Sequence, residues 1–490
     1  MNKNRDNPVL PEIFDLSLLI PCPEALACLS VSHARRLQAL PIAIREHDAQ
    51  RILIVACTSI TDTATTERVA KHIDRQFTLH FVSCRAELLP SVIDECYTTL
   101  CEFQQMLNTL HAVDGSSYQV PDVGEFPLKF INAVLLASVR MRASDIHLSP
   151  DSSLLVVRLR VDGVLIDYAK LDITQLNALL VRLKIMASLD IAETRYAQDG
   201  QFSRIADGYS VDFRISTFPT VDGENTVIRL IDPTAQIRTL AALDLPYSLM
   251  QQLSNCVNRP EGLIVVCGPT GAGKSTTLFA MLAEVDKSSL SIMTLEDPVE
   301  HRIPGIRQTS IDASRHWGFA EGLRAMLRQD PDILMVGEIR DTESCAMALR
   351  AVSTGHQVLT TVHATCAHSA LHRLREFDAP DGALALSLRA IVAQRLVRCC
   401  CNQCERQGEP CSKCYGTGYF GRKIVLEILS ITPTISAMLA AGADIPSIRE
   451  VSASEGFVSM REYATELSEN GVTTKDELNR VLAPDQFANV

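Results

Sequence analysis

The sequence predicts an α/β protein whose largest part is built on a mostly parallel sheet. From residue 240 to the end, short apolar runs alternate with helix-like stretches, which is typical of parallel strands joined by crossover helices. Between residues 123 and 231, apolar and polar residues alternate instead, as in antiparallel strands with one buried face. Residues 1–111 mix short apolar strands with helix-like stretches. We therefore expect a small α/β domain, an α+β domain and a large α/β domain, in that order.

The composition sets limits on size and partners. With 490 residues and 47% hydrophobic content, the chain can bury more than one core, and its length favours about three domains. The formal net charge of -12 argues against a dominant electrostatic grip on nucleic acid, although a local basic groove would escape this average. We therefore expect no nucleic-acid partner.

The chain shows no signal of secretion or of membrane insertion. Residues 1–11 are polar, and the apolar stretch 13–20 is interrupted by Asp15 and stopped by Pro21. No window approaches the roughly 18–20 apolar residues that a membrane-spanning helix needs. The 16 cysteines are too sparse for a disulfide scaffold. We expect a cytoplasmic protein, with any membrane association being peripheral.

In the first 111 residues we expect strands at 52–55 and 79–82 and helices at 67–73 and 91–103. The polar segment 111–124 has the composition of a linker, which places the first domain boundary there.

The second domain is expected to begin with a helix, because apolar residues recur at helical spacing between 130 and 139. In the following strand, 154–160, Arg158 and Arg160 share one face while the alternate apolar residues share the other. Asp162-Gly163 predicts a hairpin turn. The segment 232–235 breaks the pattern and predicts a second linker.

Residues 268–275 read Gly-Pro-Thr-Gly-Ala-Gly-Lys-Ser, the complete G-x-x-x-x-G-K-[ST] pattern of a phosphate-binding loop. An apolar strand at 263–266 precedes it and apolar residues at helical spacing follow it, as such a loop requires. The glycines allow the backbone to curl so that successive N–H groups face the phosphates. Lys274 supplies a positive charge, and Ser275 supplies an oxygen for Mg²⁺.

The residues predicted to bind the nucleotide are Gly268, Pro269, Thr270, Gly271, Ala272, Gly273, Lys274, Ser275 and Thr276. The alternative, an ordinary glycine-rich turn between a strand and a helix, does not account for the complete eight-residue match. The sequence therefore predicts that the chain binds and hydrolyses ATP.

Hydrolysis also needs groups that orient water and neutralise the charge on the γ-phosphate. Glu296 and Glu338 each follow an apolar strand, at the edge where ligands of such sheets bind. We predict Glu296 as the general base and Glu338 as the indirect partner of Mg²⁺. His356 and His363 flank the run 358–362 and are predicted to sense or orient the γ-phosphate. The alternative for each is a solvated acid or a structural histidine.

Two C-x-x-C pairs, Cys401 with Cys404 and Cys411 with Cys414, have the spacing of zinc ligands. Four thiolates close a tetrahedral site with no open position, so the zinc would be structural. The spacer of six residues is short, and the adjacent Cys399 and Cys400 leave the ligand register open. Unmetallated or redox-active thiols are the alternative.

Together these segments resemble the secretion ATPases that power type II secretion systems and type IV pilus assembly. The phosphate loop, the acidic segment 296–300, the strand that ends at Glu338 and the histidine segment 356–363 occur in the family's order. Segments 143–147 and 158–163 match the family's middle domain, so the resemblance covers about 125–485.

The resemblance implies three domains. They are an N-terminal docking domain at 1–111, an α+β middle domain at 123–231, and a RecA-like ATPase domain at 240–490 with a zinc-binding module at 399–414.

The resemblance also implies a homo-hexameric ring, in which the middle and motor domains of neighbouring subunits close over ATP. Arg214 and Arg229 fall where the family places arginines that complete the site, and a guanidinium offers a planar fork to phosphate oxygens. The implied partners are an inner-membrane platform protein and the cytoplasmic domain of a membrane protein. The ring would lie in the cytoplasm, peripheral to the inner membrane, and would power pilus assembly or protein secretion.

Three other functions stay open on the sequence. A pilus retraction ATPase shares the motor motifs, although such enzymes generally lack the large N-terminal region and the cysteine module. A DNA-translocating or conjugation ATPase would need a basic groove that composition does not reveal. A silent scaffold would use nucleotide only to hold its ring together.

Overall fold

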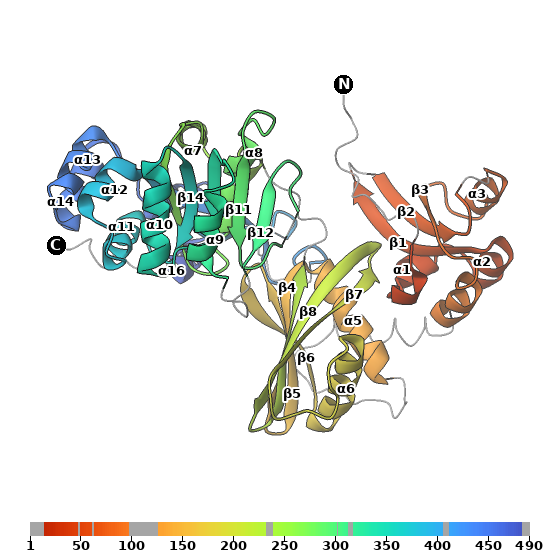
Figure 1. Ribbon diagram of the computed structural model, residues 1–490. Coiled ribbons are helices and arrows are strands. Elements are labelled where there is room, and N and C mark those ends of the chain that lie inside the picture. Colours follow the sequence, from red (N-terminus) through yellow and green to blue (C-terminus); the bar gives the residue numbers. More distant parts are fainter. Residues whose placement is uncertain are drawn as a thin grey trace. The chain divides into compact units, whose positions relative to one another are not determined.

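The computed structural model describes residues 14–47, 50–60, 63–97, 126–231, 239–300, 302–311, 317–404 and 411–482. The chain divides into two compact units, Met1–Ala235 and Gln236–Val490. The first unit contains a three-stranded and a six-stranded sheet, and the second contains a seven-stranded sheet (Figure 1). These mixed sheets and helices confirm the predicted fold class. The division into domains at 1–111, 123–231 and 240–490 stays a prediction, because the predicted linkers at 111–124 and 232–235 lie outside the described residues.

The N-terminal sheet has the order β1-β2-β3, in which β1 and β2 are antiparallel and β2 and β3 are parallel. Its elements are η1 (Leu16–Leu18), α1 (Pro23–Leu26), α2 (Val31–Leu37), β1 (Ala39–His47), β2 (Gln50–Cys57), α3 (Thr63–Ala70) and β3 (Phe77–Ser83).

Both strands predicted in this region are confirmed, since 52–55 lies within β2 and 79–82 within β3. The helix predicted at 67–73 corresponds to α3, which begins earlier and ends at Ala70. Residues 89–97 are helical, and the remainder of the helix predicted at 91–103 lies outside the described residues.

The six-stranded sheet is antiparallel throughout, in the order β6-β5-β4-β9-β8-β7. Its elements are α5 (Phe126–Arg140), β4 (Ala143–Asp151), β5 (Leu154–Val161), β6 (Val164–Asp172), η2 (Ile173–Gln175), α6 (Leu176–Met186), β7 (Gln198–Ala206), β8 (Tyr209–Thr220) and β9 (Gly223–Ile231).

One face of this sheet packs on α5 and α6. The apolar side chains of β5 are buried there together with apolar residues of both helices. Arg158 and Arg160 lie on the opposite face of β5, as the alternation predicts. The predicted hairpin turn at Asp162-Gly163 joins β5 to β6 and has positive φ at both residues. The polar face is therefore free to carry charged side chains.

The turn between β7 and β8 lies against the N-terminal sheet. Arg45 of β1 donates a hydrogen bond from Nη2 to the Gly208 carbonyl at 2.6 Å. The guanidinium also lies 3.7 Å from the centroid of the Tyr209 ring. A Cβ on Gly208 would come within 2.8 Å of the Ala43 Cβ, so the backbone of the turn touches β1 directly. The two sheets of the first unit are thus in close contact at this turn.

The seven-stranded sheet of the second unit has the order β12-β11-β13-β14-β10-β15-β16. All neighbouring strands are parallel except β15 and β16, which form an antiparallel pair. Its strands are β10 (Gly262–Cys267), β11 (Ile292–Glu296), β12 (Arg307–Ser310), β13 (Ile333–Val336), β14 (Gln357–Val362), β15 (Leu388–Cys400) and β16 (Tyr419–Ser430).

Helices cover both faces of this sheet. They are η3 (Ala241–Leu243), α7 (Tyr247–Val257), α8 (Lys274–Ala283), α9 (Phe319–Met326), α10 (Thr342–Ser353), α11 (Ala367–Glu376), α12 (Asp381–Ser387), α13 (Pro433–Ala440), α14 (Ile445–Ser454), α15 (Met460–Glu469) and α16 (Lys475–Val481). The side chains of strand β10 point alternately into two cores. Ile264 and Val266 pack with α7 and α8 on one face. Leu263 and Val265 pack with α9, α10 and α11 on the other face. A strand buried on both faces explains the uninterrupted apolar run at 263–266.

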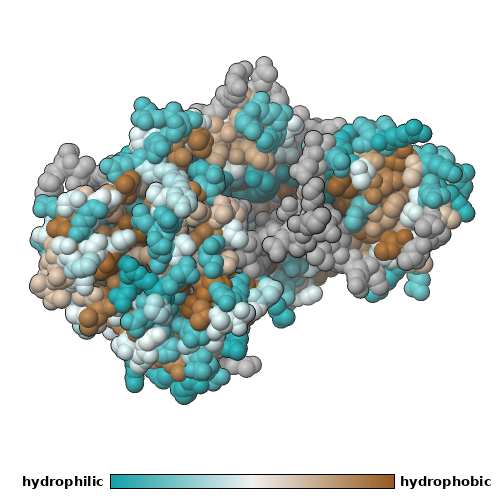
Figure 2. Space-filling model, turned by 90° about the horizontal axis from the view of Figure 1, so that it is seen from above, coloured by the Kyte–Doolittle hydropathy of each residue, from teal (hydrophilic) through white to brown (hydrophobic). Residues whose placement is uncertain are grey.

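Among the described residues, no helix combines the length and the apolar character needed to cross a membrane. On the face shown in Figure 2, hydrophilic residues are interspersed with small, separate apolar areas. Large apolar side chains that are exposed include Tyr196, Phe218 and Tyr247.

The contact at the β7–β8 turn makes a prediction about stability. Gly208 and Gly163 both follow an aspartate in a hairpin turn and both have positive φ, but a Cβ on Gly163 meets nothing within 4 Å. Gly163→Ala should cost about 1–2 kcal/mol from backbone strain alone. Gly208→Ala should cost about 1–3 kcal/mol more, because its methyl group overpacks against Ala43. Thermal unfolding of the two variants measures the difference, and equal melting temperatures would contradict the close contact.

Candidate nucleotide-binding site

The phosphate loop connects the carboxyl end of β10 to the first turn of α8. Gly268, Gly271 and Gly273 have φ values of 154°, 77° and 84°, a region that side chains disfavour. Gly273 is the residue that precedes α8, and Lys274 begins the helix. The free N–H groups of the first helical turn therefore adjoin the loop, and they form an anion-binding site together with the helix dipole. The nine residues predicted to bind nucleotide, 268–276, are the loop and this first turn.

Lys274 is folded back onto the loop. Its Nζ donates hydrogen bonds to the carbonyl oxygens of Gly268 at 2.9 Å and Pro269 at 3.1 Å. Partial burial lowers the pKa of the Lys274 ammonium, and the nearby carboxylate of Glu338 acts in the opposite direction. A phosphate group would give this partly desolvated cation a stronger partner than two carbonyl oxygens.

Glu338 and His363 gather beside Lys274. Glu338 follows β13 and His363 follows β14, and these strands are parallel neighbours. The Nε2 atom of His363 lies 3.3 Å from a carboxylate oxygen of Glu338. Arg340 pairs with the same carboxylate. An acid, an imidazole and the loop lysine therefore meet at one edge of the sheet.

Glu296 ends β11 at the same edge, since Leu295 is in register with Val336 of β13. Glu296 is 7% exposed. One carboxylate oxygen accepts hydrogen bonds from the Thr294 hydroxyl at 2.5 Å and from Nε2 of Gln308 at 3.0 Å. These bonds fix the orientation of the side chain, which suits a group that must hold a water molecule in place.

The structure places His356 away from the phosphate loop of its own chain, so its role in sensing or orienting the γ-phosphate stays a prediction. Residue 356 comes directly before β14, so it lies at the amino edge of the sheet, whereas the phosphate loop follows the carboxyl end of β10. Its carbonyl accepts a hydrogen bond from the N–H of Gly262, the first residue of β10. Its Nδ1 lies 2.9 Å from the Ala351 carbonyl and 3.0 Å from the Thr354 hydroxyl. His356 thus closes the end of α10 rather than contacting a phosphate.

Arg214 and Arg229 belong to the six-stranded sheet of the first unit. They are directly opposite one another on β8 and β9. Arg229 donates a hydrogen bond from Nε to Asp145 at 3.2 Å, and its side chain is still 64% exposed. The residues opposite Arg229 on the next two strands are Asp145 on β4 and then Arg160 on β5. On the polar face of this sheet, Arg160 and Arg229 therefore both pair with Asp145, and Arg214 lies beside Arg229. The role of Arg214 and Arg229 in the site stays a prediction.

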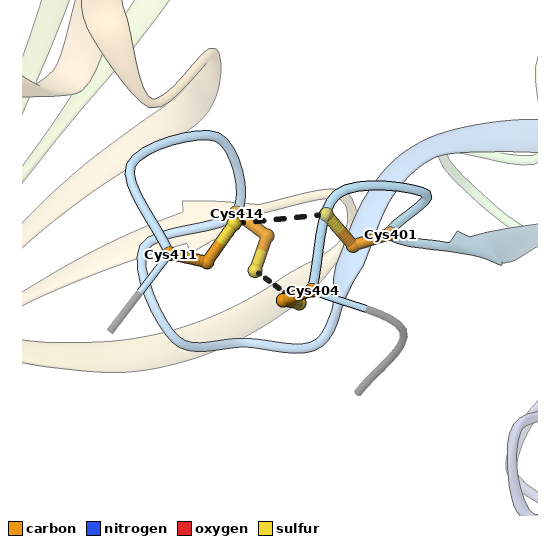
Figure 3. A group of neighbouring side chains, drawn as sticks. All are labelled: Cys401, Cys404, Cys411 and Cys414. Carbon is orange, nitrogen blue, oxygen red and sulfur yellow. Dashed lines mark hydrogen bonds between the residues drawn. The ribbon is translucent and has the colours of Figure 1, made fainter. Parts of the chain in front are cut away.

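The four cysteines with metal-ligand spacing come together between two loops (Figure 3). The sulfur atoms of Cys401 and Cys411 are 3.9 Å apart, and those of Cys404 and Cys414 are 3.6 Å apart. Sulfur atoms at the corners of a tetrahedral zinc site would be about 3.8 Å apart, given zinc–sulfur bonds of about 2.3 Å. The donor set and its spacing fit zinc. Cys399 and Cys400 end β15 and are not part of the cluster.

Two residues that touch the predicted acids were not assigned a role from the sequence. Arg340 stands two residues after Glu338 in the sequence, and it pairs with both Glu338 and Asp297. Gln308 stands on the edge strand β12 and contacts Glu296. No motif points to Gln308, because its contact depends on β12 pairing with β11.

Comparison with known proteins relates this chain to a family of secretion system proteins. Residues 124–480 match the family described as "Type II/IV secretion system protein". The type II secretion system protein HxcR of Pseudomonas aeruginosa is 42% identical over 360 residues, which cover 72% of this chain and 77% of that protein. Type II secretion system protein E of Klebsiella pneumoniae is 34% identical over 496 residues, covering 96% of this chain and 92% of that protein. The crystal structure of the pilus retraction motor PilT with bound ADP is 25% identical, with a TM-score of 0.50, and covers 70% of this chain and 94% of that one.

The placement of the two histidines makes a prediction that separates them. His363→Ala should lower the rate of ATP turnover, because the imidazole beside Glu338 is lost from the phosphate edge. His356→Ala should lower the melting temperature by the equivalent of about 1 kcal/mol and leave kcat and KM unchanged, because only bonds at the end of α10 are removed. Turnover and thermal unfolding of both variants test this. A His356→Ala enzyme that folds normally but turns over slowly would instead support a role of His356 in sensing or orienting the γ-phosphate.

Proposed function

The chain belongs to the type II/IV secretion system protein family, and on this premise we propose that it is an ATPase motor that powers type II protein secretion or type IV pilus assembly. The observation that supports this most strongly is that Glu338 and His363 pair at the edge of the sheet where the phosphate loop and Lys274 lie. Protein E of Klebsiella, a type II secretion protein, matches nearly the whole chain.

The proposed mechanism assigns one task to each group. The loop amides and Lys274 bind the phosphates, and Ser275 with Glu338 would hold Mg²⁺, directly and through water. Mg²⁺, when bound, neutralises charge on the β- and γ-phosphate oxygens. Glu296, held by Thr294 and Gln308, accepts the proton of the attacking water. His363 orients Glu338 and reports on the γ-phosphate.

We further propose that the chain assembles into a homo-hexamer. In such a ring, Arg214 and Arg229 would neutralise the γ-phosphate charge at a neighbouring protomer's site. Their support is the position of the two arginines side by side on one sheet face, with Arg229 largely exposed. Turnover would then move the protomers and do mechanical work on an inner-membrane platform protein.

The proposed location is the cytoplasm, peripheral to the inner membrane. The N-terminal sheet and its helices would bind the cytoplasmic domain of a membrane protein. The supporting observations are the match to secretion proteins over 72% and 96% of the chain and the absence of a membrane-spanning helix among the described residues.

We propose that Cys401, Cys404, Cys411 and Cys414 bind one structural zinc ion. All four sulfur atoms lie within 4.8 Å of one another. Burial raises the pKa of the Cys401 thiol, but hydrogen bonds from the backbone of Cys404 and Gln403 and from the Cys404 and Cys411 side chains together lower it to about 7, which favours the thiolate that zinc needs. The ion would hold together the loop between β15 and β16.

One specific observation favours a pilus retraction motor as the alternative. The match to the PilT structure extends over 94% of the PilT chain. The secretion relatives have higher identity and, in one case, extend over the N-terminal region as well. Complementation of a secretion-deficient or pilus-deficient strain would distinguish secretion, assembly and retraction.

Glu296→Gln should reduce kcat for ATP by about 100-fold or more, because the amide cannot accept a proton. Nucleotide affinity should be retained, since the change keeps the size and the hydrogen bond from Thr294. Glu343→Gln is a matched control, because Glu343 is an exposed carboxylate on α10 that pairs with Arg324. Steady-state turnover and fluorescent-nucleotide titration measure both effects. Wild-type rates for Glu296→Gln would refute its role as the base, and a wild type without any turnover would refute the ATPase proposal.

The zinc proposal predicts one zinc ion per chain, released when the thiols are modified. Cys411→Ser should abolish stoichiometric zinc and lower the melting temperature, because three thiolates bind zinc far more weakly than four. Cys400→Ser should retain zinc, because Cys400 lies next to the cluster in sequence but outside it in space. A metal-sensitive dye quantifies the ion. Zinc-free wild type, or equal loss in both variants, would count against the site.

A further inference from the structure

Strand β15 extends beyond the end of β10 and runs beside the phosphate loop. Ala393 of β15 is in register with Cys267, the last residue of β10. Gln394 therefore lies level with Gly268, where the loop begins. A Cβ on Gly268 would come within 2.6 Å of the Gln394 carbonyl oxygen, so the two backbones are in direct contact.

The side chain of Gln394 reaches the other end of the loop. It is 0% exposed, and its Nε2 donates a hydrogen bond to the Ala272 carbonyl at 2.7 Å. A Cβ on Gly273 would lie 3.3 Å from the same nitrogen. One glutamine thus touches both the first and the last glycine of the loop.

This hydrogen bond fixes the direction of one peptide group. In a planar trans peptide, the carbonyl and the following N–H point in opposite directions. Because the Ala272 carbonyl points toward Gln394, the Gly273 N–H points away from β15. Gly273 directly precedes α8, where free N–H groups bind anions.

The second side-chain atom of Gln394 indicates that packing alone does not explain the residue. Its Oε1 is buried and has no hydrogen-bond partner among the described residues. A buried, unpaired acceptor destabilises the fold, and an apolar side chain of similar size would avoid that cost. The Nε2 donor of the same amide makes the contact with Ala272 that an apolar side chain could not make.

Arg395 holds the main chain of Gln394 in place. Its Nη1 donates to the Gln394 carbonyl and its Nη2 to the Thr365 carbonyl, each at 2.9 Å. Thr365 lies in the segment that follows His363. The glutamine is therefore attached to a fixed part of the same sheet edge.

We propose that Gln394 is a positioning residue for the phosphate loop, which holds the Ala272–Gly273 peptide so that the Gly273 N–H faces the bound phosphates. The inference rests on the proposed function, because it assumes that the loop binds a nucleotide. Strand β15 would then take part in nucleotide binding, although it lies outside the phosphate-loop motif.

The chain offers a closely matched control in Gln357. This residue is 1% exposed, donates from Nε2 to the Val257 carbonyl at 2.9 Å and to the Cys256 carbonyl at 3.2 Å, and also has a buried, unpaired Oε1. It begins β14 at the amino edge of the sheet, away from the phosphate loop. A change at either glutamine removes a buried amide and its hydrogen bonds, one at Gln394 and two at Gln357, but only Gln394 is beside the loop.

The test compares Gln394→Met and Gln357→Met in the full-length protein. Both variants should lower the melting temperature without nucleotide, and Gln357→Met should do so at least as much as Gln394→Met, because it removes two hydrogen bonds rather than one. Only Gln394→Met should bind a fluorescent ADP analogue about tenfold more weakly and show a raised KM for ATP with a smaller change in kcat. Gln394→Asn keeps the amide but is one methylene too short to reach Ala272, and it should show the same loss.

Each outcome decides the matter. Gln394→Met and Gln394→Asn variants that bind the analogue within twofold of wild type would overturn the positioning role and leave the proposed function intact. An equal loss of affinity in Gln357→Met would also overturn it, because the effect would then be a general loss of stability. A wild type that binds no nucleotide would overturn the proposed function together with this inference.

Discussion

The site depends on one constraint, the common direction of the strands in the seven-stranded sheet. Because β10, β11, β13 and β14 are parallel, the segments that follow them all emerge at the same edge. The phosphate loop, Glu296, Glu338 and His363 are each the end of a strand or the residues just after it. Reversing any one strand would carry its functional residue to the opposite edge.

The antiparallel hairpin of β15 and β16 supports this edge from the side. Gln394 contacts the phosphate loop, while Glu427, in register with Ala393, accepts hydrogen bonds from the first N–H groups of α11 and α15. Burial raises the pKa of the Glu427 carboxyl, against the pull of these donors. The cysteine cluster closes the loop between the same two strands. One hairpin therefore connects the phosphate loop, two helices and the proposed zinc site.

The first unit shows the complementary arrangement, a sheet with one apolar and one polar face. The apolar face packs on α5 and α6 and supplies the core of this domain. The other face carries Arg160, Arg214 and Arg229, and the first and last of these pair with Asp145. Arg229 keeps 64% of its side chain exposed despite its pairing with Asp145, which is consistent with a role in binding phosphate.

Features that are encoded in continuous stretches could be predicted from the sequence alone. These are the α/β class, most strands, the hairpin at Asp162-Gly163, the phosphate loop and the two cysteine pairs, because backbone conformation and periodicity are local properties. The tertiary structure decided which of the candidate residues meet. It placed His356 at the edge of the sheet opposite the phosphate loop, since a residue before a parallel strand lies opposite those that follow one. It also revealed Gln308 and Gln394, whose contacts depend on strand pairing and, for Gln394, join residues 122 positions apart.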